Sequence, residues 1–490
     1  MIVFPVARKP VPGLSSAADE GRGMLDIQRR RTRGFFALIT LPATAMGFAL
    51  SVQISVLSWI LATRYHLDIE EIGLVWAAGP LAGIVGQVAV GIVSDRVWIW
   101  NGRRRVFILV GGIVAALMIL ALPAIGGISH ALGFDSVIGV AVTVSLALDL
   151  AINLSFNPTR ALIADVTPEG PERSRGYGWM QTISGSFGVL AYAIGALFGN
   201  DALIYAAVAV ILLLSVVPIL LIEEPRDLPP PREAEPGANL RTIGLLSPLA
   251  AVLVYDIYAM GARLTGATPV RGLPELLCAG ATALLIAHAL VTRQPFRRII
   301  AAHAMSWIGV QSLFIYLVSF IQHRMPWLDD TELGRVTALA YLVLNGVAAL
   351  APALLLAPLA TRFRRVHVHA ASLGLMAIAF AAIWSVGHSP AVLFALMAVA
   401  GIGWGAIVSL PFAIMSERVE PARIGLFMGL FNLAVVLPQL VASFALGAWA
   451  NGTNDKGAIF LVGACCLALS AMLWLFVGAI GRREQIHDSL

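Results

Sequence analysis

Long apolar stretches separated by short polar loops recur along most of this 490-residue chain, from about residue 34 to about residue 479. Each holds about 20 residues or more, which as a helix crosses the roughly 30 Å hydrocarbon core of a bilayer. They are too long for transmembrane strands, and open strands would leave backbone groups without hydrogen bonds in lipid. Only 12% of the residues are charged, against about 25% in soluble domains. We therefore expect an all-α integral membrane protein.

The apolar stretches predict fourteen transmembrane helices. They are expected near residues 34–63, 72–93, 106–129, 136–163, 177–199, 202–222, 244–260, 274–292, 300–321, 336–358, 366–386, 390–415, 424–449 and 457–479. If the N-terminus is placed in the cytoplasm, the outer loops hold few basic residues, namely Arg64, Arg263, Arg271, Arg324, Arg335 and Lys456. Because cytoplasmic loops are enriched in Lys and Arg, both termini are expected in the cytoplasm. The net charge of +5 then reflects the basic residues of the cytoplasmic loops, which set the membrane orientation, and no nucleic-acid partner is expected.

Two pairs of similar loops divide the chain into halves. SDRVWIWNGRRR (94–105) follows the second span and ATRFRRV (360–366) the tenth, while ERSRGYGWMQ (172–181) and EPARIGLFMGLFN (420–432) enter the fifth and thirteenth. Two six-helix halves with an inserted two-helix hairpin account for this pattern, as expected for carriers with a central site. The predicted parts are a basic arm (1–33), an N-terminal half (34–222), a proline-rich linker (223–243), the hairpin (244–292), a C-terminal half (293–479) and a tail (480–490).

Asp149 lies in the middle of the fourth predicted span. A carboxylate at that depth needs a partner, a water-filled cavity or a proton. Asn153, Asn157 and Arg160 follow at helical spacing, so they share one face with Asp149, and Arg160 is about 16 Å further along the axis. We expect this polar stripe to line a central cavity, with Asp149 as a site that loads and releases a proton. The alternative is that Asp149 only packs in a helix interface.

Charged residues of the loop after the second span are candidates for a gate. Asp95, Arg96, Arg103, Arg104 and Arg105 could pair with Asp165 and Arg175 near the loop between the fourth and fifth spans. Breaking such pairs in one conformation would open the cytoplasmic side. The arginines could equally serve only to set membrane orientation.

Amide side chains within the spans are candidate substrate contacts, because they both donate and accept hydrogen bonds. The candidates are Gln53, Asn153, Asn157, Gln181, Gln311 and Asn432. Trp59, Trp76, Trp179 and Trp307 could stack on a sugar face. Each amide could instead join two helices, and each tryptophan could be packing. No phosphate-binding glycine loop, metal cluster or nucleophile triad appears in the sequence, so no enzyme, cofactor or metal site is expected.

Three of these segments resemble the glycoside–pentoside–hexuronide:cation symporters of the major facilitator superfamily, in their plant-type sucrose–proton symporter branch. SDRVWIWNGRRRVFI is similar to that branch's loop between helices 2 and 3. DLAINLSFNPTRALIAD is similar to its fourth helix, and GLFMGLFNLAVVLPQL to its eleventh. The resemblance implies alternating access, with the coupling acid at Asp149, its arginine at Arg160 and the first-helix glutamine at Gln53. Ile152 and Asn157 depart from the family pattern. The seventh core helix also lacks the acidic pair of that family, and the inserted hairpin lies outside its pattern.

The expected function is proton-coupled symport of a disaccharide, such as sucrose, maltose or another α-glucoside. The proton gradient would drive it without a cofactor, and the partners would be the sugar, the proton and membrane lipid, with the chain working as a monomer. Short loops and a compact arm favour a bacterial inner membrane. Two alternatives stay open: an exporter or facilitator of other small solutes on the same fold, and a non-transporting membrane scaffold or sensor.

Overall fold

The computed structural model describes residues 32–84, 86, 90, 98–100, 102–167, 171–222, 224, 244–264, 270, 272–292, 294–416 and 424–478. Apart from one isolated bridge between Ile99 and Gly102, its regular structure is helical. Asp95 and Arg96 of the predicted gate lie outside the described residues. So do most of the basic arm, most of the linker and the C-terminal tail.

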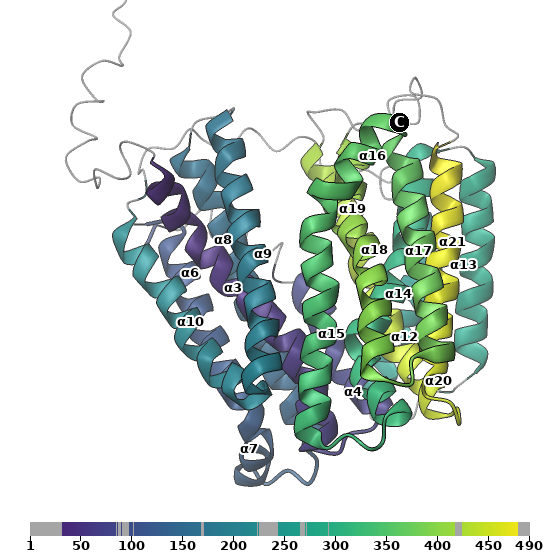
Figure 1. Ribbon diagram of the computed structural model, residues 1–490, viewed down its shortest axis with the longest axis horizontal. Coiled ribbons are helices and arrows are strands. Elements are labelled where there is room, and N and C mark those ends of the chain that lie inside the picture. The colour runs from purple at the N-terminus through teal and green to yellow at the C-terminus, as the bar shows by residue number, and fades with distance from the viewer. Residues whose placement is uncertain are drawn as a thin grey trace, which may run out of the picture.

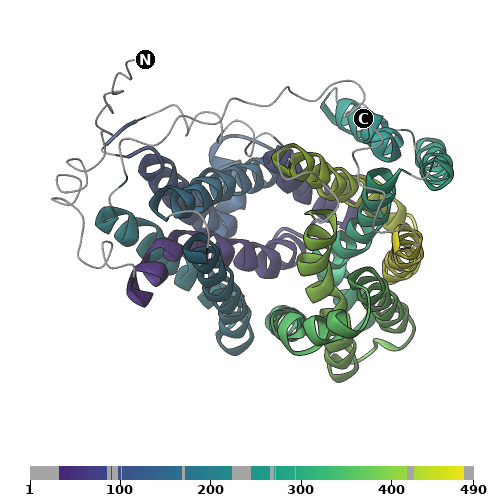
Figure 2. The same cartoon turned by 90° about the horizontal axis from the view of Figure 1, so that it is seen from above.

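The helices of the N-terminal part form one bundle (Figures 1 and 2). They are α3 (Arg33–Thr63), α4 (Ile69–Trp76), α6 (Arg105–Ala121), the turn η1 (Leu122–Ala124), α7 (Ile125–Ala131), α8 (Ile138–Val166), α9 (Pro171–Phe198) and α10 (Asn200–Leu221). Helix α3 packs along α8, α9 and α10, and α6 packs on α8 and α10. Helix α3 is therefore central in this bundle, and most of its side chains from Phe35 onward are buried.

The helices of the C-terminal part form a second bundle beside the first (Figure 2). They are α14 (Pro295–Arg324), α15 (Asp330–Ala351), the π-helical turn η3 (Pro352–Leu356), α16 (Ala357–Arg362), α17 (Arg365–Val386), α18 (Pro390–Ser416), α19 (Ile424–Val441), the π-helical turn η5 (Ala442–Leu446), α20 (Gly447–Asn451) and α21 (Ala458–Gly478). Between the two bundles in sequence come the turn η2 (Ser247–Leu249), α12 (Ala250–Leu264) and α13 (Leu273–Val291). Figure 2 shows α12 and α13 at the outer edge of the second bundle.

Within the described residues, twelve helices are long and apolar enough to cross a membrane. Each coincides with one of the fourteen predicted spans. The other two predictions fall on the segment that begins with α4, which is described only in part beyond residue 84, and on α12, which has 15 residues. The chain is therefore an all-α, multi-pass membrane protein.

Polar caps fix where several helices begin. Asp68 caps α4 by accepting hydrogen bonds from the backbone of Glu70 and Glu71, while the Glu71 carboxylate accepts from the Asp68 backbone. Asp329 caps α15 by accepting from the backbone N–H of Glu332 at 2.8 Å. Such side chains satisfy N–H groups that lack partners at a helix start. These caps lie together at one end of the molecule, which we call the acidic face. The opposite end, with Arg103–Arg105 and Arg362–Arg365, we call the arginine-rich face.

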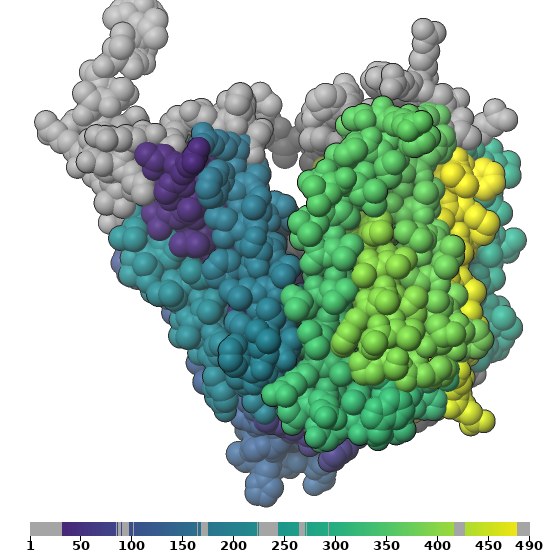
Figure 3. Space-filling model, in the orientation of Figure 1, coloured from purple at the N-terminus to yellow at the C-terminus, as the bar shows by residue number. Residues whose placement is uncertain are grey.

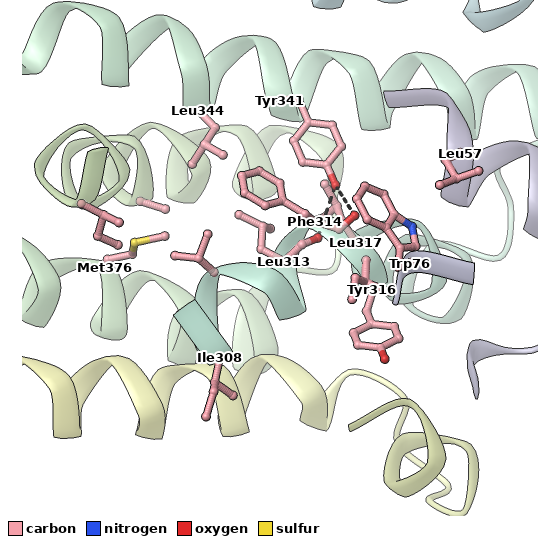
Figure 4. Packing of buried hydrophobic residues seen from close by; sticks show 14 of the residues in the cluster. Leu57, Trp76, Ile308, Leu313, Phe314, Tyr316, Leu317, Tyr341, Leu344 and Met376 are labelled. Atoms are coloured by element: carbon pink, nitrogen blue, oxygen red, sulfur yellow. Dashed lines mark hydrogen bonds between the residues drawn. The ribbon is translucent and has the colours of Figure 1, made fainter. Parts of the chain in front are cut away.

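The two bundles meet at the acidic face and separate toward the arginine-rich face. The space-filling view shows a notch between α9 and α15 that is open at the arginine-rich face and closed below (Figure 3). At the closed end, Ser58 of α3 donates to the Ile315 carbonyl of α14 at 2.8 Å, and the Trp59 indole donates to the Asp330 carbonyl at 2.8 Å. The buried cluster around α14 accordingly contains Leu57 and Trp76 from the first bundle (Figure 4).

Candidate functional site

Asp149 lies on α8 with only 8% of its surface exposed. Gln53 of α3 donates from its Nε2 to the Asp149 Oδ2 at 3.0 Å. Gln53 is itself 2% exposed, and its Oε1 has no hydrogen-bond partner. The carboxylate therefore has one fixed neutral donor across the helix interface, with an unpaired acceptor beside it. A buried polar atom without a partner is costly, and a substrate hydroxyl or a water would relieve that cost.

A glycine-lined helical stretch after α4 packs against the Asp149 side of α8. A Cβ on Gly79 would lie 3.3 Å from the Asp149 Oδ2, and a Cβ on Gly86 would lie 3.1 Å from the Asn153 Cβ. These two glycines are seven residues apart, which returns them to one face of a helix. Glycine lets the helices approach closely enough to bury the carboxylate. Sequence reasoning missed this contact, although the GPLAGIVG spacing at 79–86 carried its signal.

The predicted polar stripe on α8 becomes more exposed toward the arginine-rich face. Asn153 is partly buried and donates to the Asp149 carbonyl at 2.8 Å, and Asn157 is partly buried with an unpaired Nδ2. Arg160 is exposed, and its guanidinium lies 4.1 Å from the centre of the Phe156 ring. Among the described residues, no ion pair joins Arg160 to Asp149 in this conformation. The stripe thus connects a buried acid to an exposed cation.

Aromatic side chains of the second bundle form a cluster that includes one predicted residue, Trp307. Its ring meets Trp404 edge to face at 5.9 Å, and Phe314 meets Trp404 at 5.3 Å. The Trp404 indole donates to the Asn345 Oδ1 at 3.1 Å, and the Trp307 indole to the His303 Nε2 at 2.9 Å. Both tryptophans are only partly buried, so hydrogen bonds hold side chains that remain partly exposed.

The aromatic cluster reaches the first bundle through Tyr341. Its ring lies 6.0 Å from Phe314 and 5.7 Å from Tyr192 of α9. Sequence reasoning did not single out Tyr341 or Trp404 as site residues, because helical spacing alone cannot say which face of α15 or α18 meets the other bundle. The tryptophan within the small-residue run GIGWG was the available signal.

The remaining predicted amides lie in different surroundings. Gln311 of α14 is buried and accepts from the Gln439 Nε2 of α19 at 3.1 Å, so it joins two helices of the second bundle. Asn432 of α19 is partly buried. Gln181 of α9 is exposed. The structure therefore brings Gln53 and Asn153 next to Asp149 and leaves Gln181 at the surface.

Two predicted sugar-stacking residues occupy the closed end instead. The Trp59 indole donates to a carbonyl of α15, and the Trp76 indole donates to the Ser58 Oγ at 2.8 Å. Both side chains are buried. In this conformation both residues fit the packing alternative, because each side chain is buried and each indole N–H already has an acceptor.

The loop before α6 is held by two carboxylates. Arg104 is buried and donates from Nε to the Asp165 Oδ2 at 3.1 Å, which is one of the predicted pairs. Glu224 accepts hydrogen bonds of 2.7–3.0 Å from the backbone N–H groups of Arg103, Arg104 and Arg105. Glu224, which follows α10 in the sequence, thus caps the start of α6. Sequence reasoning missed this role. Arg175 lies 5.3 Å from the Phe36 ring.

Comparison with known proteins assigns the fold to a family. Residues 39–443 match the family model of the Major Facilitator Superfamily. Sucrose transport protein SUC4 of Arabidopsis thaliana is 24% identical over 448 residues, covering 83% of this chain and 82% of that protein. A general alpha-glucoside permease of Schizosaccharomyces pombe is 29% identical over 174 residues, 34% of this chain and 31% of that protein.

A solved structure of the nucleoside transporter NupG superposes with a TM-score of 0.65 at 12% identity, over 90% of this chain and 99% of that one. At this identity the likeness concerns the fold alone. Together with the family match over most of the chain, it agrees with the predicted all-α architecture. The proteins it matches are membrane transporters and not enzymes. The chain therefore belongs to the Major Facilitator Superfamily.

Proposed function

We propose that the protein is a proton-coupled disaccharide symporter in which Asp149 carries the proton. The observation that carries this proposal is the Asp149–Gln53 pair at the buried start of the α8 stripe. A carboxylate in that position is costly to keep ionised without a cation, so it favours binding a proton when the site is closed. Arg160, on the same face of α8 but about 16 Å further along the axis, places a positive charge toward the arginine-rich face.

The substrate side of the proposal rests on tryptophans of the second bundle and amides of the first bundle. Amphipathic aromatic rings such as Trp307 and Trp404 suit the apolar face of a sugar ring. Gln53 and Asn157 have unpaired polar atoms that could bind sugar hydroxyls. The sucrose and alpha-glucoside carriers among the relatives are consistent with a disaccharide of this class.

In the proposed transport cycle, the space between the bundles opens alternately to the arginine-rich face and to the acidic face. Here the bundles are in contact at the acidic face, and the notch between α9 and α15 lies toward the arginine-rich face (Figure 3). The positive-inside rule would put the arginine-rich face in the cytoplasm, with both termini, in a bacterial inner membrane. The conformation would then be inward-open, and Arg104–Asp165 would rearrange when that side closes. A single chain holds all the groups invoked, so a monomer suffices.

The direct test is uptake into proteoliposomes of labelled sucrose, maltose and trehalose, with an imposed pH gradient and then with a sodium gradient. The proposal predicts that an inward pH gradient drives at least one disaccharide uphill and that a sodium gradient alone does not. Accumulation driven only by sodium, or transport of none of the three sugars by an intact protein, would reject the coupling ion or the substrate class respectively.

A further inference from the structure

The inserted hairpin touches both bundles at the acidic face. Tyr255 and Ala259 of α12 share a buried apolar cluster with Leu440 of α19, Phe444 of η5 and Ala77, which follows α4. The side of α12 that carries Val254 and Ile257 is exposed. Helix α12 therefore covers the line where the first bundle, through α4, meets the second bundle, through α19 and η5.

Charge interactions hold the acidic-face end of α12. The Arg263 Nη2 lies 3.8 Å from the Glu70 Oε1 of α4, and the guanidinium lies 4.8 Å from the centre of the Phe444 ring. The Tyr255 hydroxyl donates to the Glu275 Oε1 of α13 at 3.1 Å. One cation of the hairpin thus contacts both bundles. These contacts form only when α12 packs against the closed end, where the two bundles meet.

Asp256 sits on the buried side of this seated helix. It is 4% exposed, and neither carboxylate oxygen has a hydrogen-bond partner or an ion pair among the described residues. Thr282 of α13 is also buried, and Cys278 of α13 packs against the same apolar cluster as Tyr255. An ionised carboxylate in such surroundings would be strongly unfavourable, because it has lost its hydration and gained no partner. A carboxylic acid would cost much less.

Among the described residues, the titratable and charged groups around Asp256 offer no compensating cation. On α13 they are Cys278, Glu275 and His288, of which Glu275 is bound to Tyr255 and His288 lies near the far end of its helix. The described residues of α19 and of η2 contain no charged side chain. On α4 the acids Glu70 and Glu71 lie at the helix start. Arg263 of α12 is turned toward Glu70 and Phe444.

We propose that Asp256 is a second proton-binding site, and that uptake of a proton from solvent is required for α12 to seat across the two bundles. When the carboxyl loses that proton, the charge can be hydrated only if α12 moves away from α13 and α19. Protonation would thereby brace the closed acidic face, and deprotonation would release the brace. This inference does not depend on the nature of the transported solute.

Spin-label distance measurements on the full chain test the proposal. Labels on Ile257→Cys and Trp327→Cys, with Cys278, Cys465 and Cys466 replaced by alanine, report α12 relative to the second bundle, since both label sites are exposed. We expect one narrow distance population in acidic buffer and a second population in alkaline buffer. In Asp256→Asn, which stays neutral, the narrow population should persist in both buffers.

Two further variants keep the interpretation unambiguous. Glu275→Gln removes the other carboxylate of the hairpin contact and should keep the pH response. Labels on Leu132→Cys and Trp327→Cys follow the separation of the bundles themselves. A distribution for α12 that does not change with pH, an unchanged response in Asp256→Asn, or loss of the response in Glu275→Gln instead would overturn the proposal.

Discussion

Single residues of the second bundle set how a sugar ring could be held. Trp404 contacts Trp307 and Phe314 edge to face, and Asn345 fixes its indole N–H. The hydrogen bond leaves Trp404 little rotational freedom, so the ring is already placed before a substrate arrives. Ordering a side chain in advance lowers the entropy cost of binding.

Trp404→Ala should raise the KM for the transported sugar by about tenfold, equivalent to ~1.4 kcal/mol of lost binding free energy. Trp404→Phe should retain most of the affinity, because it keeps an aromatic face. Initial rates of uptake across sugar concentrations would check both variants. Equal KM values for wild type and Trp404→Ala would remove this ring from the sugar site.

The buried acid was predictable from the sequence and its surroundings were not. A lone carboxylate in a 26-residue span stands out by its cost, and spacing placed Asn153, Asn157 and Arg160 on its face. The close approach of Gly79 and the donation from Gln53 depend on how three helices cross, which one-dimensional spacing does not encode. For the same reason the sequence could not decide whether Trp59 and Trp76 stack on substrate or pack, and the structure shows them packed at the closed end.

At the scale of elements, carboxylates from distant segments fasten helix ends. Glu224 accepts from three successive N–H groups at the start of α6, where unpaired donors and the helix dipole favour an anion. Asp455, between α20 and α21, accepts from Arg324 at 2.9 and 3.0 Å and from Trp384 at 2.9 Å. It thereby connects the ends of α14 and α17.

Glu224→Gln should destabilise the protein by about 1–2 kcal/mol, because a charged acceptor at a helix start is replaced by a neutral one. Hydrogen exchange should increase at residues 103–108, and the melting temperature in detergent should fall. Glu332→Gln is the matched control, an exposed acid in the first turn of α15 that holds no loop. Similar losses in both variants would argue against a specific role for Glu224.

The Asp455 network predicts a pH-dependent contribution to stability. Partial burial would raise the pKa of the Asp455 carboxyl, but hydrogen bonds from Trp384 and the Gly457 backbone, with the charge of Arg324, outweigh it and lower that pKa. Its contribution is therefore present above the unfolded-state pKa of about 3.9 and is lost as the pH falls through the lower folded-state value.

Melting temperatures of wild type and Asp455→Asn should accordingly differ at neutral pH and converge in strongly acidic buffer. Asp135→Asn, in an exposed loop, should match wild type throughout. A difference that grows on acidification would contradict the assignment.

The whole molecule is two bundles closed at one end, and small residues make that closure possible. A Cβ on Gly73 of α4 would meet the Ser443 carbonyl oxygen and would lie 2.6 Å from the Tyr316 hydroxyl. Most spans follow from apolar length and loop charge, whereas the family was inferred from the resemblance of three segments. The end at which the bundles meet could not be predicted, because it depends on packing between segments that are distant in the sequence.

Gly73→Ala should shift the molecule toward a state that is open at the acidic face. Spin labels on Leu132→Cys and Trp327→Cys, on opposite bundles, should then show longer distances than in the parent protein. Gly139→Ala, whose added Cβ meets nothing within 4 Å, is the control. Unchanged distances in Gly73→Ala would mean that this contact does not limit opening.

The most direct test of the central claim separates sugar exchange from proton-driven accumulation in Asp149→Asn. The amide cannot exchange a proton but keeps the shape of the carboxyl. We predict that this variant exchanges sugar across proteoliposomes with equal sugar on both sides and fails to accumulate sugar under a pH gradient, while Asp135→Asn does both. Accumulation at the wild-type level by Asp149→Asn would contradict the claim that Asp149 carries the coupled proton.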